Sequence, residues 1–170
     1  MSDCPVFRAD QVHPSAFIAA GAVVLGDVTI GEGSSIWFHV VIRGDVDAIR
    51  IGDRTNVQDG TVVHADESLP CIIGNDVTIG HNAIVHGCTI EDNVLIGMGS
   101  VVMNGSVIGS GSIVGVGAVV TEGTIIPPRS LVLGLPAKVA RTVTEKDADR
   151  IKHAAEHYVE NARRYRHGVV

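Results

Sequence analysis

The sequence is poor in aromatic side chains and carries no excess of positive charge. It has three Phe, two Tyr and one Trp in 170 residues, so we expect Val, Ile, Leu and Ala to fill its core. A formal net charge of −6 argues against nucleic acid or an anionic membrane as a partner. No apolar run approaches the ~20 residues that a membrane-spanning helix needs. The length suits one globular unit.

Cysteine is also scarce, and its spacing excludes two common uses. Cys4, Cys71 and Cys88 are odd in number and form no Cys-x-x-Cys pair, so we predict neither a disulfide framework nor a zinc knuckle. The first ten residues lack the basic and apolar regions of a secretory signal. Free thiols in a reducing, cytoplasmic setting are the expectation that follows.

What the sequence does contain is a six-residue repeat. An aliphatic residue recurs at every sixth position, often followed by Gly, as in IGNDVT (73–78), IGHNAI (79–84), IGMGSV (96–101) and IGSGSI (108–113). This period fits neither an α-helix nor a hairpin meander. It predicts an all-β solenoid in which three hexapeptides close one triangular coil and the aliphatic residues point inward. Successive coils then stack at the strand spacing of about 4.8 Å.

Two segments interrupt this repeat. Residues 64–72 exceed one hexapeptide and predict a polar loop that bulges from a corner. After 126–141, where prolines end the repeat, apolar residues at helical spacing predict an α-helix, with Thr144 and Asp147 as a capping box. We therefore expect a hexapeptide-repeat domain over 1–141 and a C-terminal α-helix over 142–170 that packs on it or on a neighbour.

Three of the eight histidines are placed by the repeat. His64 and His86 each follow an inward Val, and these two valines lie three hexapeptide steps apart. Both imidazoles should therefore point outward from the same corner, about one strand spacing apart, close enough to share a metal ion. His81 belongs to the preceding face of the prism.

With these features the chain resembles the γ-class carbonic anhydrases. The resemblance rests on the hexapeptide repeat, the C-terminal helix and the histidine spacing, with RGD at 43–45, NVQDG at 56–60 and, less specifically, GLPAKVAR at 134–141. It implies a left-handed parallel β-helix that forms a homotrimer. It also implies Zn²⁺, or alternatively Fe²⁺ or Co²⁺, at each subunit interface. The implied ligands are His64 and His86 from one subunit and His81 from its neighbour.

The activity implied by the resemblance is the reversible hydration of CO₂ to bicarbonate by a metal-bound hydroxide. Three imidazoles leave a fourth tetrahedral position open for water, and zinc lowers the pKa of that water to about 7 in known carbonic anhydrases. The resemblance gives Gln58 and Asn56 the role of orienting water and CO₂. It makes Arg43, Asp45 and Asp59 an ion-pair network around the site.

The sequence also departs from the family prototype. Val46 follows the RGD run where the prototype has a glutamate. The loop after His64 is shorter than the acidic loop that carries the prototype's proton shuttle, and Glu67 is the best substitute there. Tyr158 is a candidate for an active-site tyrosine from the C-terminal region. These departures put fast turnover in doubt but leave the metal ligands in place.

Two other functions remain open from the sequence. Hexapeptide solenoids also host CoA-dependent acyltransferases, which use one His as a general base on an acceptor. A non-catalytic trimeric metal-binding or scaffold protein is the second alternative. Two stacked histidines with a third at fixed spacing favour the metalloenzyme, because an acyltransferase requires one catalytic His and a CoA groove.

Overall fold

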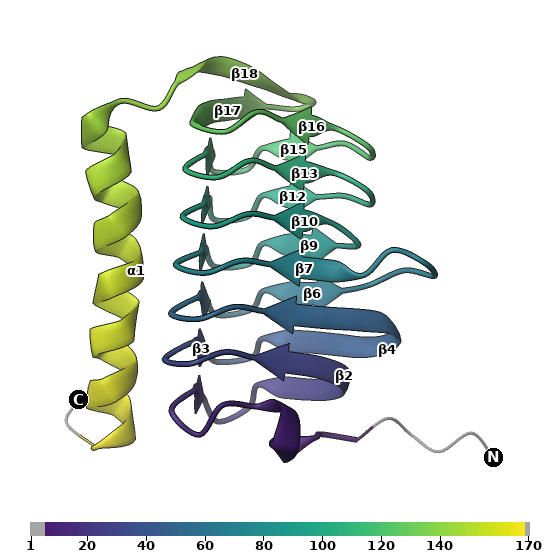
Figure 1. Ribbon diagram of the computed structural model, residues 1–170, viewed down its shortest axis with the longest axis vertical. Coiled ribbons are helices and arrows are strands. Elements are labelled where there is room, and N and C mark those ends of the chain that lie inside the picture. The colour runs from purple at the N-terminus through teal and green to yellow at the C-terminus, as the bar shows by residue number, and fades with distance from the viewer. Residues whose placement is uncertain (1–5, 169–170) are drawn as a thin grey trace.

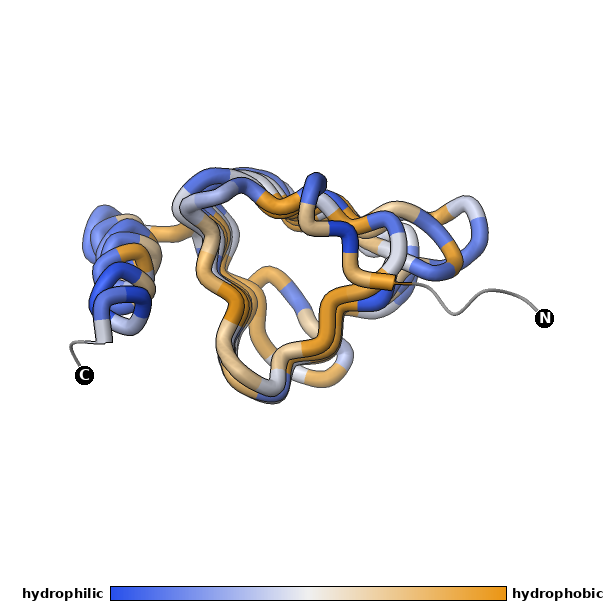
Figure 2. Tube along the Cα trace, turned by 90° about the horizontal axis from the view of Figure 1, so that it is seen from below, coloured by the Kyte–Doolittle hydropathy of each residue, from blue (hydrophilic) through white to orange (hydrophobic). Residues whose placement is uncertain are grey.

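The chain folds as a left-handed parallel β-helix with one long α-helix beside it (Figure 1). The computed structural model describes residues 6–168. Viewed along its axis, the solenoid has a three-sided section, and the helix runs along one side (Figure 2). This confirms the fold class that the six-residue repeat predicts.

Each side of the prism is a stack of short strands in parallel register. The first face contains β1 (Phe17–Ile18), β3 (Ser35–Ile36), β5 (Asn56–Val57), β8 (Thr78–Ile79), β11 (Leu95–Ile96), β14 (Ile113–Val114) and β17 (Ser130–Gly134). The second face contains β6 (Val62–His64), β9 (Ile84–His86), β12 (Val101–Val102) and β15 (Val119–Val120). The third face contains β7 (Cys71–Ile73), β10 (Thr89–Ile90), β13 (Val107–Ile108) and β16 (Ile125–Ile126).

Two longer strands join the second face to the third. In β2 (Val23–Ile30) and β4 (Val41–Ile51) the first residues pair on the second face and the last residues pair on the third. A short 3₁₀ helix, η1 (Ala9–Gln11), precedes the first coil. The last coil is closed by β18 (Ala137–Thr142), which pairs antiparallel to β17.

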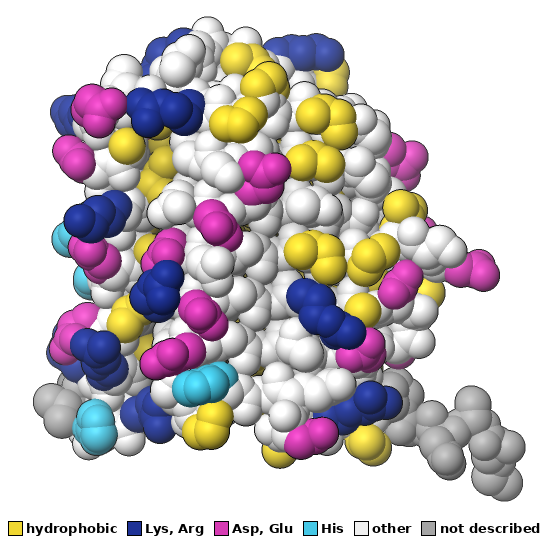
Figure 3. Space-filling view, in the orientation of Figure 1, with side chains coloured by type: hydrophobic (Ala, Val, Ile, Leu, Met, Phe, Trp, Pro, Cys, Tyr) yellow, Lys and Arg dark blue, Asp and Glu magenta, His cyan; other side chains and the backbone are white. Residues whose placement is uncertain are grey.

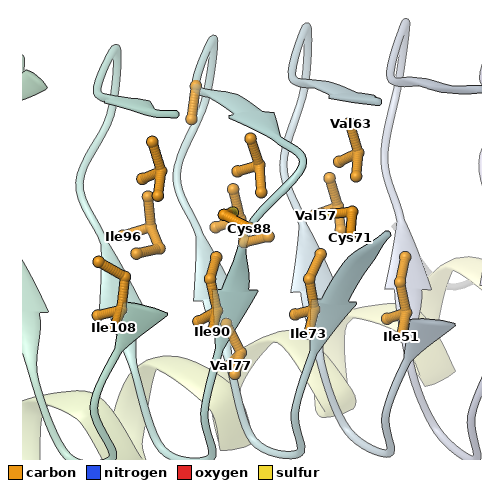
Figure 4. Close-up of a cluster of buried hydrophobic side chains, with 14 of the residues drawn as sticks. Ile51, Val57, Val63, Cys71, Ile73, Val77, Cys88, Ile90, Ile96 and Ile108 are labelled. Carbon is orange, nitrogen blue, oxygen red and sulfur yellow. The ribbon is translucent and has the colours of Figure 1, made fainter. Parts of the chain in front are cut away.

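The core consists of aliphatic columns, because in-register stacking places each inward residue on its counterpart in the next coil. On the third face Ile51, Ile73, Ile90 and Ile108 lie one above another (Figure 4), and each is at most 3% exposed. Equivalent columns line the other two faces. Burial of this apolar surface is the main source of stability for a fold with so few aromatic residues.

The helix α1 (Glu145–Arg166) lies against the first face, where it contacts β1, β3, β5 and β8. Thr144 and Asp147 form the predicted capping box: the Thr144 hydroxyl accepts from the Asp147 backbone N–H, and the Asp147 carboxylate accepts from the Thr144 backbone N–H. Ile151 and Ala155 of α1 are buried. Within residues 6–168, no helix is long and apolar enough to cross a membrane.

Candidate metal centre

The corner between the second and third faces brings His64 and His86 together. The two histidines end β6 and β9 and are direct register partners, as are the inward Val63 and Val85 before them. The Nδ1 atom of His64 lies 2.9 Å from the Nε2 atom of His86. The side chain of His64 is 14% exposed. Stacked register therefore produces a close pair of ring nitrogens at the surface.

The other nitrogen of each ring is occupied by an oxygen acceptor. His64 Nε2 lies 3.2 Å from Asp45 Oδ1, and His86 Nδ1 bonds to Asn104 Oδ1. The Asn104 amide nitrogen donates to Asp66 Oδ2 at 2.9 Å, which orients the amide so that its carbonyl faces His86. We call these residues, together with Arg43, the His64/His86 corner.

These contacts assign the protons of both rings. A carboxylate and a carbonyl oxygen only accept, so the protons of neutral rings lie on His64 Nε2 and His86 Nδ1. His64 Nδ1 and His86 Nε2 then carry lone pairs that face each other. Two such lone pairs repel unless a proton or a metal cation lies between the rings. A carboxylate or carbonyl behind an imidazole is also the usual outer contact of a metal-ligating histidine.

The residues therefore fit a divalent metal of the zinc type. Zinc prefers imidazole nitrogen at 2.0–2.1 Å, which would separate two tetrahedral ligand atoms by about 3.3 Å. The observed 2.9 Å is close to that value. Within residues 6–168, however, no three His, Cys, Asp or Glu side chains converge on one point, so a single chain offers only part of a three-histidine site.

A backbone feature allows Asn104 to reach His86. Gly87 has a φ of +51°, and a Cβ atom added there would lie 2.9 Å from Asn104 Oδ1 and 3.3 Å from Leu69 Cβ. Asn104 belongs to no motif of the sequence, but the repeat indicates its place: the Val85–Val102 pairing puts residue 104 directly above residue 87, next to His86.

Arg43 and Asp45 belong to the same corner. Arg43 is the register partner of His64 in the coil below, and its guanidinium donates to Asp45. Burial raises the pKa of Asp45, but hydrogen bonds from Arg43, from its own backbone and from His64 together bring the pKa below its ordinary value. Asp45 therefore stays an anion beside His64.

His81 lies at the opposite edge of the second face, between the first and second faces. Its Nδ1 is 2.8 Å from Asp59 Oδ2. The His81 side chain is 39% exposed. The predicted trio of Arg43, Asp45 and Asp59 is thus divided between two corners within one chain.

Asn56 and Gln58 accompany His81 rather than His64. Both amides are buried, on and just after β5. The Asn56 amide nitrogen donates to Thr78 Oγ1 at 2.9 Å, and Gln58 Nε2 donates to Asn56 Oδ1 at 3.0 Å. This chain of bonds orients the Gln58 amide. Within residues 6–168 no side-chain hydrogen bond engages its Oε1, which is available as an acceptor.

Tyr158 of α1 completes what we call the His81 corner: Asn56, Gln58, Asp59, His81 and Tyr158. With Gln58 and His81 it lines a cavity of ≈ 230 Å³ between α1 and the solenoid. Burial, and next the negative charge of Asp59, raise the pKa of Tyr158, so its hydroxyl remains a donor at neutral pH.

The remaining candidates lie outside both corners. Glu67 is exposed on the loop that follows His64 and touches neither histidine ring, while its backbone N–H donates to Asp66. Cys71 and Cys88 are free thiols buried among the aliphatic side chains of the core (Figure 4). A hydrogen bond with Cys71, together with burial, raises the pKa of Cys88 and keeps that thiol protonated. Cys4 lies outside the described residues.

Comparison with known proteins places the chain among the hexapeptide-repeat proteins. The sequence matches the family described as bacterial transferase hexapeptide (six repeats) over residues 11–44, 70–102 and 87–122. It resembles a solved structure of a hexapeptide transferase family protein from Anaplasma phagocytophilum, with 44% identity and a TM-score of 0.88 over 91% of this chain and 92% of that one.

Two relatives narrow the class to a family. A protein named "Probable carbonic anhydrase" from Methanocaldococcus jannaschii is 59% identical over 88% of this chain and 94% of its own length. A carbonic anhydrase from Geobacillus kaustophilus is 47% identical over 94% of this chain and 87% of its own. The chain belongs to the γ-class carbonic anhydrase-like family of hexapeptide-repeat proteins.

Proposed function

We propose that this protein is a metal-dependent carbonic anhydrase that interconverts CO₂ and bicarbonate at sites between subunits. The observation that carries the proposal is the pair of ring nitrogens, His64 Nδ1 and His86 Nε2, that face each other with their protons held on the opposite sides. The sequence identity of 59% and 47% to relatives named carbonic anhydrase supports the same reaction.

The metal would be held by His64 and His86 of one chain and His81 of the next. Zn²⁺ is the expected ion, with Fe²⁺ or Co²⁺ as alternatives, because all three bind imidazole nitrogen. Such an ion supplies Lewis acidity, which lowers the pKa of a coordinated water toward neutrality. Asp59, whose Oδ2 lies 2.8 Å from His81 Nδ1, would hold the ring so that Nε2 faces the neighbouring subunit.

The second face provides a surface on which a second copy can pack. Its outward positions form an unbroken aliphatic column in register: Val23, Val41, Val62, Ile84, Val101 and Val119. Val23, Val62 and Ile84 are 45%, 39% and 42% exposed. Contiguous exposed apolar surface of this kind marks protein interaction sites.

The two corners flank this column, which supports a cyclic homotrimer. A threefold axis parallel to the prism keeps every residue at its own height. His81 and His86 belong to the same coil, so an interface through the second face would present His81 of one chain to His86 of the next at matching height. Asp45 and Arg43 would lie across the same interface from Asp59.

The chain's own polar groups have defined roles in this proposal. The Asn56–Gln58 chain fixes Gln58 Oε1 as an acceptor that would hold the attacking water by one of its hydrogens. Asn56 acts by holding Gln58. Glu67, exposed on the loop beside the His64/His86 corner, is the predicted proton carrier between the site and bulk water.

The test is stopped-flow CO₂ hydration by zinc-loaded protein. Gln58→Ala should lower the hydration rate by about 10- to 100-fold and leave the bound metal unchanged, because Gln58 acts on water rather than on a ligand. Asn75→Ala is the matched control, since the Asn75 amide bonds to Asp53 and Asp92 at the corner between the third and first faces, and its rate should equal that of the wild type. A zinc-loaded wild type without hydration above buffer would refute the proposal.

A CoA-dependent acyltransferase is the second candidate, favoured by the solved hexapeptide transferase family structure at 44% identity. Acetyl-CoA consumption in the presence of amine or hydroxyl acceptors, measured on the same samples, separates the two functions. Consumption that persists in His64→Ala without bound metal would support the transferase.

A further inference from the structure

The loop between β6 and β7 extends to the level of Asn104, one coil above His86. It projects from the His64/His86 corner (Figure 1), and acidic side chains lie on this projecting edge (Figure 3). Its 66–69 turn is closed by two backbone hydrogen bonds between Asp66 and Leu69, of 3.2 and 2.9 Å. Asp66 Oδ2 accepts from the Asn104 amide nitrogen at 2.9 Å, although the two residues are 38 positions apart. The loop is therefore bonded to the residue that contacts His86.

Both oxygens of the Asp66 carboxylate accept hydrogen bonds. Oδ1 accepts from the Glu67 backbone N–H at 2.9 Å, and Oδ2 accepts from the Asn104 side chain. These hydrogen bonds lower the pKa of Asp66 below its ordinary value, so the group stays an anion and can only accept. The part of the Asn104 amide that faces Asp66 is therefore its NH₂ group, because only that part donates.

An amide behind a histidine differs from a carboxylate because it can rotate by half a turn. The Asp45 carboxylate behind His64 presents an acceptor in either orientation, so it fixes the His64 proton without a further partner. The Asn104 amide presents its carbonyl to His86 Nδ1 in the observed orientation. After half a turn it would donate to Nδ1 instead. The proton of the neutral ring would then move to Nε2, the nitrogen that faces His64.

We propose that Asp66 selects the tautomer of His86 by fixing the orientation of the Asn104 amide. Asp66 and Asn104 are then positioning residues, which hold the ring proton on Nδ1 and leave the lone pair of Nε2 free for a cation shared with His64. This inference rests on the metal site of the proposed function. It also gives two neighbouring acids of one turn different roles, because within residues 6–168 no hydrogen bond joins the Glu67 side chain to either ring.

NMR of the histidine ring nitrogens tests this inference on the full chain after a chelator has removed the metal. At about pH 8 an ordinary imidazole is neutral, and the nitrogen chemical shifts show which nitrogen holds the proton. His86→Ala assigns the His86 signals by difference, and the wild type should have this proton on Nδ1. Asp66→Ala should shift the population toward the Nε2–H tautomer. It should also lower zinc affinity about 3- to 10-fold in a chelator competition, the effect of losing one hydrogen bond.

Glu67→Ala is the matched control. It removes the same charge from the same turn but keeps the backbone N–H that bonds to Asp66, so neither the tautomer nor the zinc affinity should change. The double variant Asp66→Asn, Asn104→Asp inverts the pair. The new amide at position 66 would donate to the new carboxylate at position 104, and that carboxylate would accept from His86 Nδ1. The double variant should therefore restore the wild-type tautomer and zinc affinity.

A contact that only ordered the loop would give a different result. Asp66→Ala would then speed proteolysis of the turn and leave the His86 tautomer unchanged. Equal tautomer populations in Asp66→Ala and Glu67→Ala would overturn the inference and leave the proposed function standing. So would a double variant that behaves like Asp66→Ala. A wild type that has the His86 proton on Nδ1 but binds no zinc would refute the proposed function and leave the selection of the tautomer standing.

Discussion

Complementation between two inactive variants tests whether the metal lies between subunits. His81→Ala removes the proposed ligand at one corner of the second face, and His86→Ala removes a proposed ligand at the other. A homotrimer of either variant alone has no complete site. A mixed trimer can regain all three histidines at one interface. There the His81→Ala chain gives the His64/His86 corner, and the His86→Ala chain gives His81.

The expected recovery follows from counting. With equal co-expression and random assembly, about three quarters of the trimers are mixed, and a cyclic mixed trimer has one complete interface of three. About one quarter of the wild-type metal content should therefore return. Elemental mass spectrometry of protein purified without chelator measures the zinc content per chain and so gives this recovery directly. Native mass spectrometry, with a short tag on one chain, verifies the fraction of mixed trimers.

The control pairing is His64→Ala with His86→Ala. Both changes damage the same corner, so no interface of a mixed trimer is complete and no metal should return. Recovery in this pairing would refute the assignment of ligands to two chains. So would an absence of recovery in the first pairing when mixed trimers are shown to form.

Three further predictions follow from single contacts. Gly87→Ala should lower zinc affinity about 10- to 100-fold in a chelator competition, because its Cβ displaces the amide that orients His86. Ile84→Lys puts a charge into the apolar column, so light scattering should find monomers whose circular dichroism is unchanged. Hydrogen bonding to Arg141 holds the pKa of Asp147 far below its ordinary value. The helix cap therefore contributes stability above about pH 4, and this contribution is lost as the pH falls. In acid titrations of the folded protein, Asp147→Asn should lack that loss of stability.

Much of the fold could be predicted from the sequence because the repeat period equals the structural period. An inward aliphatic residue at each sixth position places Val63 beneath Val85, and the histidines that follow them are then forced into contact. The capping box at Thr144 and Asp147 is a local signal of the same kind. Neither inference needs contacts between distant segments.

Other features of the site depend on such contacts. The position of α1 on the first face is set by tertiary packing, and that packing places α1 against β5 and brings Tyr158 to the cavity that Gln58 and His81 line. Asn104 could have been placed by counting one coil from Gly87. Its bond to His86, however, depends on the side-chain orientation that Asp66 imposes. Ring tautomers likewise follow from contacts that no sequence period encodes.

The same fold supports transferases and carbonic anhydrases, so the site must decide between them. A histidine that acts as a general base needs its lone pair to face the acceptor it deprotonates. Here the lone pair of His64 faces the lone pair of His86 at 2.9 Å, and Asp45 and Asn104 hold the protons on the far sides. Such a pair is poorly arranged to take a proton from a third group, because each ring blocks the other. It is well arranged to share one cation, and this difference favours the metalloenzyme.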